Sequence, residues 1–144
     1  MTRPAAEPDV AAIVKIEQTC FGGSAWSASL VTDEVRSERH VVLVTDDLLG
    51  YGAISLAGDV ADLDRIAVLP DARGRGLART LLNDLVDRAR DLGADRMLLE
   101  VAADNRAAIG LYDSFGFDTI STRAGYYTGG VDALVMELPI AEWR

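Results

Sequence analysis

A strand-like run that passes directly into a glycine-rich turn and then into a helical pattern constrains this chain most. It spans Leu63 to Ala78 and reads LDRIAVLPDARGRGLA. The apolar residues before Pro70 have the spacing of a strand, and a helical apolar pattern begins after Gly76. A helix start leaves four backbone N–H groups without partners and carries the positive end of the helix dipole. The junction is therefore typical of an anion-binding site, and a pyrophosphate would suit it.

The spelling of this turn separates it from two common phosphate-binding loops. The Walker A pattern is absent, and the dinucleotide pattern G-x-G-x-x-G fails because Arg79 stands where its last glycine belongs. The turn instead reads Arg73-x-x-Gly76-x-Ala78, with Arg75 adding a further positive charge. It resembles the [QR]-x-x-G-x-[GA] signature with which GNAT acyltransferases bind the pyrophosphate of acetyl-coenzyme A. A solvated arginine–glycine turn is the alternative that the rest of the chain must decide.

Length and composition limit the remaining possibilities. At 144 residues the chain suits a single domain, 1–144, with a sizeable core. No apolar run reaches the roughly 18 residues of a membrane span and no apolar leader is visible, so we expect a cytoplasmic protein with no membrane partner. The net charge of −9 argues against nucleic-acid binding, which needs clustered Lys and Arg. Cys20 and His40 are the only cysteine and histidine, so we expect neither a disulfide nor a metal site.

The order of the remaining elements predicts one fold class. Apolar periodicity and the capping residues Asp9, Ser27 and Asn105 indicate helices over 10–21, 24–38, 76–92 and 105–115, and Cys20 falls on the buried apolar stripe of the first. Strand patterns cover 1–8, 40–45, 48–56, 60–69, 96–101, 117–122 and 131–138. Successive strands imply an antiparallel meander, and the helix over 76–92 supplies the crossover that a parallel pair requires. We predict an α+β fold, a mixed α/β sandwich with helices on both faces of a twisted, mostly antiparallel sheet with one central parallel pair.

The C-terminal half strengthens the resemblance to the GNAT superfamily. The segment Leu99-Glu100-Val101, followed by Asn105-x-x-Ala108-Ile109-x-Leu111-Tyr112-x-x-x-Gly116-Phe117, is similar to the RimI type, the ribosomal-protein alanine N-acetyltransferases. Further matching pieces are Ile16-Glu17, Phe21, Trp26-Ser27, Ile66-Ala67-Val68 and Tyr126-Tyr127. The resemblance implies a GNAT fold, acetyl-CoA as co-substrate, and a protein or peptide N-terminus as acceptor. Its specific expectation is the N-terminal alanine of a small ribosomal subunit protein.

Two side chains are candidates for the chemistry of amine acetylation. Glu100 is the candidate base, because a carboxylate in an otherwise apolar strand is costly unless it faces a cleft, and the family's base falls at this position. The solvent face of an edge strand is the alternative. The resemblance implies that Tyr112 is the acid that protonates the leaving thiolate, as the matching tyrosine does in the RimI type, and a tyrosine with a pKa near 10 stays protonated at neutral pH as this role requires. Ordinary core packing of Tyr112 is the alternative.

The resemblance also assigns binding residues. It implies that backbone amides of Ile66 and Val68 hold the pantetheine arm and the thioester carbonyl. The full set expected to bind the coenzyme is Ile66, Ala67, Val68, Arg73, Gly74, Arg75, Gly76, Leu77, Ala78, Asn105 and Tyr112. The acceptor groove is expected to use Glu17, Trp26, Tyr126 and Tyr127, with the Glu17 carboxylate holding the charged amine.

Proton chemistry favours an α-amine as the acceptor. Its ordinary pKa is about 7.7–8.0 against about 10.4 for lysine, so deprotonation at pH 7 costs about 1 to 1.4 kcal/mol rather than about 4.6. Two other classes remain open at this stage. One is a GNAT enzyme that acetylates a lysine side chain or a small-molecule amine. The other is a non-catalytic acyl-CoA-binding module, which the presence of both Glu100 and Tyr112 disfavours.

Overall fold

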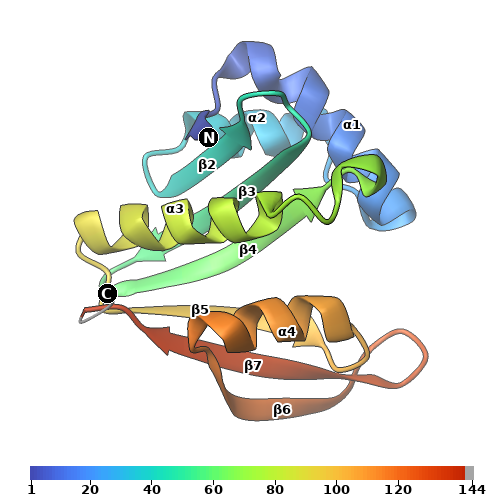
Figure 1. The fold of residues 1–144 in the computed structure, drawn as a ribbon, viewed down its shortest axis with the longest axis vertical. Coiled ribbons are helices and arrows are strands. Elements are labelled where there is room, and N and C mark those ends of the chain that lie inside the picture. Colours follow the sequence, from blue (N-terminus) through green and yellow to red (C-terminus); the bar gives the residue numbers. More distant parts are fainter. Residues whose placement is uncertain (142–144) are drawn as a thin grey trace.

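The computed structural model describes residues 1–141 as a seven-stranded sheet with helices on both faces (Figure 1). The strands are β1 (Thr2–Pro4), β2 (His40–Thr45), β3 (Gly50–Ala57), β4 (Val60–Val68), β5 (Arg96–Ala102), β6 (Asp118–Tyr127) and β7 (Val131–Pro139). The α-helices are α1 (Val10–Phe21), α2 (Ala28–Arg36), α3 (Leu77–Asp91) and α4 (Arg106–Phe115). The strand order is β1-β2-β3-β4-β5-β7-β6, and only β4 and β5 run parallel among the described pairs. The predicted fold class is confirmed.

Two details of the sequence prediction need correction. We expected the Asp9 side chain to cap α1, but its carboxylate accepts a hydrogen bond from the Ala6 amide at 2.8 Å and pairs with Arg3. Asp9 therefore closes the short turn before α1. The strand expected over 117–122 is longer, because β6 keeps pairing with β7 as far as Tyr127, which lies opposite Val131. No helix within residues 1–141 has both the length and the apolar composition needed to cross a membrane.

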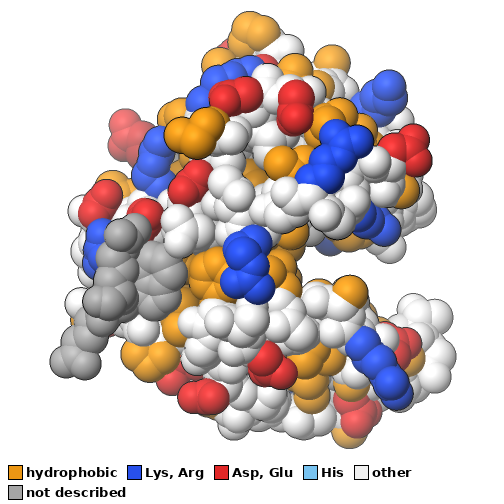
Figure 2. All heavy atoms as spheres, viewed as in Figure 1, with side chains coloured by type: hydrophobic (Ala, Val, Ile, Leu, Met, Phe, Trp, Pro, Cys, Tyr) orange, Lys and Arg blue, Asp and Glu red, His pale blue; other side chains and the backbone are white. Residues whose placement is uncertain are grey.

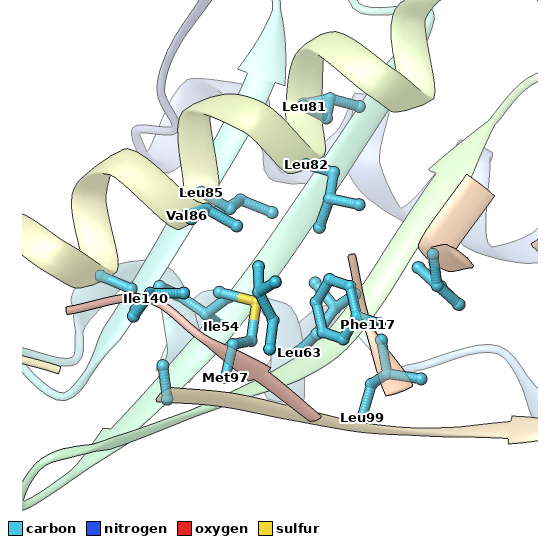
Figure 3. Close-up of a cluster of buried hydrophobic side chains, with 14 of the residues drawn as sticks. Ile54, Leu63, Leu81, Leu82, Leu85, Val86, Met97, Leu99, Phe117 and Ile140 are labelled. Atoms are coloured by element: carbon cyan, nitrogen blue, oxygen red, sulfur yellow. The ribbon is translucent and has the colours of Figure 1, made fainter. Parts of the chain in front are cut away.

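The core consists of two apolar clusters, one on each face of the sheet. On one face, Leu82 and Leu85 of α3 pack with Met97 of β5 in a fully buried cluster (Figure 3). Helix α3 lies very close to β3, because a Cβ at Gly52 would come within 2.7 Å of the Leu85 side chain. On the other face, α1 buries residues such as Ile13 completely. Packing on both faces fixes the sheet and hence the ends of its strands.

The parallel pair separates at the centre of the sheet, and this separation creates the cleft. Strands β4 and β5 pair over a short stretch, in which residues 60–62 of β4 lie opposite residues 96–98 of β5. In the pairing of β3 with β4, Asp64 has no partner residue, which marks a β-bulge. A bulge bends its strand and increases the local twist, so β4 turns away from β5 beyond this point. The space-filling view shows a deep notch between the two halves of the molecule (Figure 2).

Candidate active site

The glycine-rich turn forms a set of free backbone amides at the start of α3. Gly74 and Gly76 have φ angles of +83° and +79°, which other residues rarely adopt. The first helical bond runs from the Thr80 amide to the Gly76 carbonyl at 3.0 Å. The amides just before Thr80 are therefore those that a helix start leaves without a helical partner. A Cβ on either glycine would meet nothing within 4 Å, so the space beside these amides is open to an anion.

A cavity of about 550 Å³ lies beside this turn, between β4, α3 and α4. All residues expected to bind the coenzyme line it except Arg75: Ile66, Ala67, Val68, Arg73, Gly74, Gly76, Leu77, Ala78, Asn105 and Tyr112. Arg75 is exposed, and its guanidinium donates a hydrogen bond to the Asp71 carbonyl at 3.3 Å. The structure therefore brings together groups from three elements around one cavity, and it does not place Arg75 among them.

Two side chains, one from the turn and one from α1, donate to the last carbonyl of β4. Arg73 Nε donates to the Val68 carbonyl at 3.0 Å, and Cys20 Sγ donates to the same oxygen at 3.5 Å. Sequence periodicity placed Cys20 in the buried stripe of a helix. It is instead half-buried and lines the cavity together with Phe21. The end of α1 is therefore a wall of the coenzyme cavity, which no local pattern indicated.

The two candidate catalytic side chains line a smaller cavity of about 380 Å³, the middle cavity, which adjoins the coenzyme cavity. Glu100 reaches it from β5, which is an interior strand between β4 and β7, so β5 is not an edge strand, although the Glu100 side chain is exposed to solvent in the cleft. Tyr112 reaches it from α4 and also lines the coenzyme cavity. The residues and the resemblance to the RimI type together predicted both side chains, and the separation of β4 from β5 brings them to a common space.

Burial sets the proton chemistry of the tyrosines in this middle cavity. Tyr112 is 7% exposed, and its ring packs against Phe117 with ring centroids 5.7 Å apart. Burial, with a smaller effect of Tyr127, raises the pKa of Tyr112 to about 12. Burial and the nearby Glu100 and Tyr126 also raise the pKa of Tyr127. Both hydroxyls therefore remain proton donors across the neutral pH range.

A third cavity, of about 610 Å³, continues from the middle one on its other side. Tyr126 and Tyr127 of β6 line it, as expected for an acceptor groove, and their rings meet edge to face at 5.1 Å. Glu100 lines both cavities, and Arg123 lies 3.7 Å from its carboxylate. Asp62 and Asp64 also border the third cavity. The three cavities form one cleft, with Glu100 and Tyr112 at its centre.

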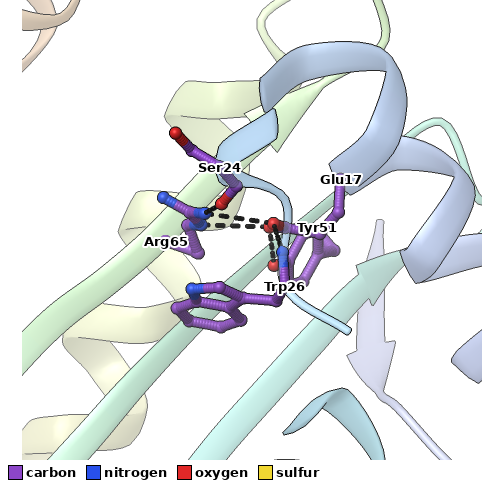
Figure 4. Close-up of polar contacts among 5 residues, drawn as sticks. All are labelled: Glu17, Ser24, Trp26, Tyr51 and Arg65. Carbon is purple, nitrogen blue, oxygen red and sulfur yellow. Dashed lines mark hydrogen bonds and ion pairs between the residues drawn. The ribbon is translucent and has the colours of Figure 1, made fainter. Parts of the chain in front are cut away.

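Two residues expected in the acceptor groove, Glu17 and Trp26, do not line it. The Glu17 side chain is fully buried, and its carboxylate accepts hydrogen bonds from Tyr51, Arg65 and the Trp26 amide (Figure 4). Because Glu17 is fully buried, its carboxylate cannot contact an incoming ammonium group directly. The Trp26 ring contacts the guanidinium of Arg65, which itself lines the middle and third cavities. The sequence did not single out Arg65 or Tyr51, because nothing local marks them.

One group of side chains combines ligand types that metal ions use. Glu34, His40 and Asp64 each bring one such atom within 4.8 Å of the others. Burial, followed by the charges of Asp64 and Glu17, raises the pKa of Glu34 to about 7, and burial raises that of Asp64. His40 Nδ1 is already engaged by the Ser37 hydroxyl at 2.9 Å. Burial therefore favours the protonated form of Glu34 near neutral pH, and His40 Nε2 lies 3.8 Å from its carboxylate.

A splayed parallel strand pair with an amide-lined turn beside it defines the class of this protein. The chain belongs to the Acetyltransferase (GNAT) family, whose sequence model matches residues 10–117, so the resemblance seen in the sequence is confirmed. The [ribosomal protein bS18]-alanine N-acetyltransferase of Escherichia coli strain K12 is 45% identical over 139 residues, which cover 92% of this chain and 93% of that protein.

Solved structures agree with the family assignment. The crystal structure of the ribosomal-protein-S18-alanine N-acetyltransferase from Escherichia coli matches with a TM-score of 0.87 and 34% identity, covering 98% of this chain and 94% of that chain. Arabidopsis thaliana NAA60 in complex with acetyl-CoA matches with a TM-score of 0.85 at 19% identity, covering 97% and 98%. The second similarity shows the shared fold.

Proposed function

We propose that this chain, acting in the cytoplasm as one acetyltransferase domain, transfers the acetyl group of acetyl-CoA to the N-terminal alanine of ribosomal protein bS18. The main support for this proposal is that the three cavities are continuous. The first has the free amides that suit a pyrophosphate, the third is open to a peptide, and Glu100 and Tyr112 both line the one between them. Similarity to a bS18-alanine N-acetyltransferase over 92% of the chain supports the choice of acceptor.

Each group of the cleft has a defined task in the proposed reaction. Acetyl-CoA supplies the acetyl thioester and leaves as the free thiol. The amides at the start of α3 and Arg73 hold its pyrophosphate, and Asn105 and the β4 backbone at Ile66 to Val68 orient the remainder. Glu100 accepts a proton from the acceptor ammonium, so that the neutral amine forms the new C–N bond as the C–S bond breaks. The Tyr112 hydroxyl gives its proton to the departing sulfur, and the second proton, which the nitrogen loses as the amide forms, restores the Tyr112 hydroxyl, while Glu100 releases its proton to solvent.

The same cleft favours an α-amine over a lysine side chain. A single carboxylate must supply only about 1 to 1.4 kcal/mol to deprotonate an α-amine at pH 7, against about 4.6 kcal/mol for lysine. Asp62 and Asp64 border the acceptor cavity near Glu100 and attract a cationic chain end. The exposed ring of Tyr126 and the half-buried Tyr127 offer surfaces along which an extended peptide can lie.

Paired peptides test the proposed acceptor. One peptide carries a free N-terminal alanine and an internal lysine, and its partner differs only in a blocked N-terminus. We expect mass spectrometry to find acetylation of the free peptide alone, at its α-amine, with one thiol released per acetyl group. Equal acetylation of both peptides would exclude the proposal and favour a lysine or small-amine acetyltransferase. Tight acetyl-CoA binding without thiol release for any amine would indicate a binding module.

A further inference from the structure

We propose that Arg65 is a positioning residue that fixes the segment 21–27, which comprises the last residue of α1 and the α1–α2 loop, as a wall of the middle cavity. This inference rests on the proposed function, because it concerns the space in which the acceptor amine binds. Arg65 lies on β4 next to the bulge at Asp64, where the cleft opens. Its side chain is 20% exposed and lines both the middle and the third cavities. No local pattern distinguishes this arginine in the sequence.

The guanidinium of Arg65 is anchored on a buried carboxylate. Its Nε and Nη2 atoms each donate to one oxygen of Glu17, both at 3.1 Å, in a two-pronged pair (Figure 4). Glu17 is fully buried on α1, and it also accepts hydrogen bonds from the Tyr51 hydroxyl and, at 2.8 Å, from the Trp26 amide. This one carboxylate therefore joins α1, the α1–α2 loop, β3 and β4.

The outer side of the same guanidinium holds the loop at three points. Nη2 donates to the Ser24 carbonyl at 2.9 Å. The guanidinium carbon lies 4.0 Å from the centre of the Phe21 ring and 4.7 Å from that of the Trp26 ring. Such cation–π contacts are attractive, and Arg forms them better than Lys because its planar group stacks on the ring. Apart from the Glu17 contact with the Trp26 amide, these loop contacts all depend on one side chain.

The pairing also makes this wall compatible with a cationic acceptor. An unpaired guanidinium beside the third cavity would repel the ammonium group of a peptide N-terminus. Because Glu17 neutralises Arg65, the wall keeps its shape without this repulsion. Phe21, the last residue of α1, lines the coenzyme and middle cavities, so a displacement of this segment would alter the space in which the acceptor amine meets Glu100. Arg65 thus acts through the loop rather than on the reacting atoms.

The movement of Trp26 tests this proposal without depending on the identity of the acceptor. In a Trp143→Phe background, Trp26 is the single tryptophan, because the sequence contains two. We expect Arg65→Gln to increase acrylamide quenching of Trp26 fluorescence at least about 2-fold, since the indole loses its contact with the guanidinium. Arg96→Gln is the matched control, because it breaks a 2.7 Å pair with Glu137 away from the loop. It should leave quenching unchanged.

Kinetics of the full chain complete the test. With the best amine acceptor that the wild-type protein uses, Arg65→Gln should raise KM for the acceptor at least about 10-fold and leave the Kd for coenzyme A within about 2-fold. If this variant does not fold, Arg65→Lys keeps the charge but loses the two-pronged pair and is measured instead. A folded variant with wild-type quenching or a wild-type acceptor KM would overturn the positioning role. Failure of the wild-type protein to acetylate N-terminal peptides would overturn only the proposed function.

Discussion

Tyr112→Phe tests the proposed proton donor by removing a single oxygen atom. Burial raises the pKa of Tyr112 to about 12 from the ordinary value of 10. Relative to a tyrosine in water, this higher pKa favours the neutral phenol over the phenolate by about 2.7 kcal/mol. The hydroxyl is therefore a proton donor throughout the pH range of an assay. Loss of a positioned acid lowers the rate by about 10²–10⁴-fold, or about 2.7 to 5.5 kcal/mol of transition-state stabilisation.

The same substitution should have little effect on the fold. Among residues 1–141 the Tyr112 hydroxyl has no hydrogen-bond partner, whereas its ring packs against Phe117 at 5.7 Å. Because phenylalanine keeps the ring, we expect the free energy of unfolding to change by less than about 1 kcal/mol. Urea unfolding measures this change, and calorimetry should find coenzyme A affinity close to that of the wild type.

Single-turnover acetylation is the decisive assay, because product release can limit kcat and conceal a slower chemical step. Enzyme in excess over acetyl-CoA is mixed with a free N-terminal peptide, and acetylated product is followed by rapid quench. A rate within about 3-fold of the wild type, with chemistry shown to be limiting, would refute Tyr112 as the acid. Loss of rate together with loss of coenzyme binding would instead assign Tyr112 to the coenzyme site.

Three further perturbations test the remaining parts of the structure. Glu100→Gln should lower the single-turnover rate about 10²-fold or more at pH 6.5, and the defect should shrink as pH rises through the α-amine pKa of about 7.7–8.0; a defect independent of pH would argue against a base. Gly76→Asp places a side chain and a negative charge at a φ of +79° beside the free amides. Calorimetry should therefore detect no coenzyme A binding, while the circular dichroism spectrum stays native. Unchanged affinity would exclude the turn as the phosphate site. The folded-state pKa of Glu34, about 7, exceeds its ordinary 4.5, so the native state binds the extra proton and stability falls as pH rises across this window. With solvent screening of this half-buried group, Glu34→Gln should stabilise the fold by about 1 kcal/mol at pH 8 relative to its effect at pH 5, and urea unfolding that finds equal effects at both would contradict the raised pKa.

Local sequence determined the elements and the phosphate-binding turn. The turn was predictable because its glycines, its arginines and the change from strand to helical spacing lie within sixteen consecutive residues, from Leu63 to Ala78. The caps of α2 and α4 were predictable for the same reason. The Ser27 and Asn105 side chains accept hydrogen bonds from the amides three residues ahead, at 3.1 and 3.2 Å. The parallel strand pair followed from the length of the intervening helix. Each of these features depends on neighbours in the chain.

The tertiary structure alone decided how the cleft is built. Strand β7 lies between β5 and β6, which places Tyr126 and Tyr127 across the cavity from β4. The buried pair of Glu17 and Arg65 joins residues 48 positions apart, and burial removes Glu17 from the acceptor groove where the family resemblance had placed it. Periodicity reports which side of its own element a residue occupies. It carries no information on which side chains from distant elements meet, because packing of α1 and α3 on opposite faces of the sheet sets those distances.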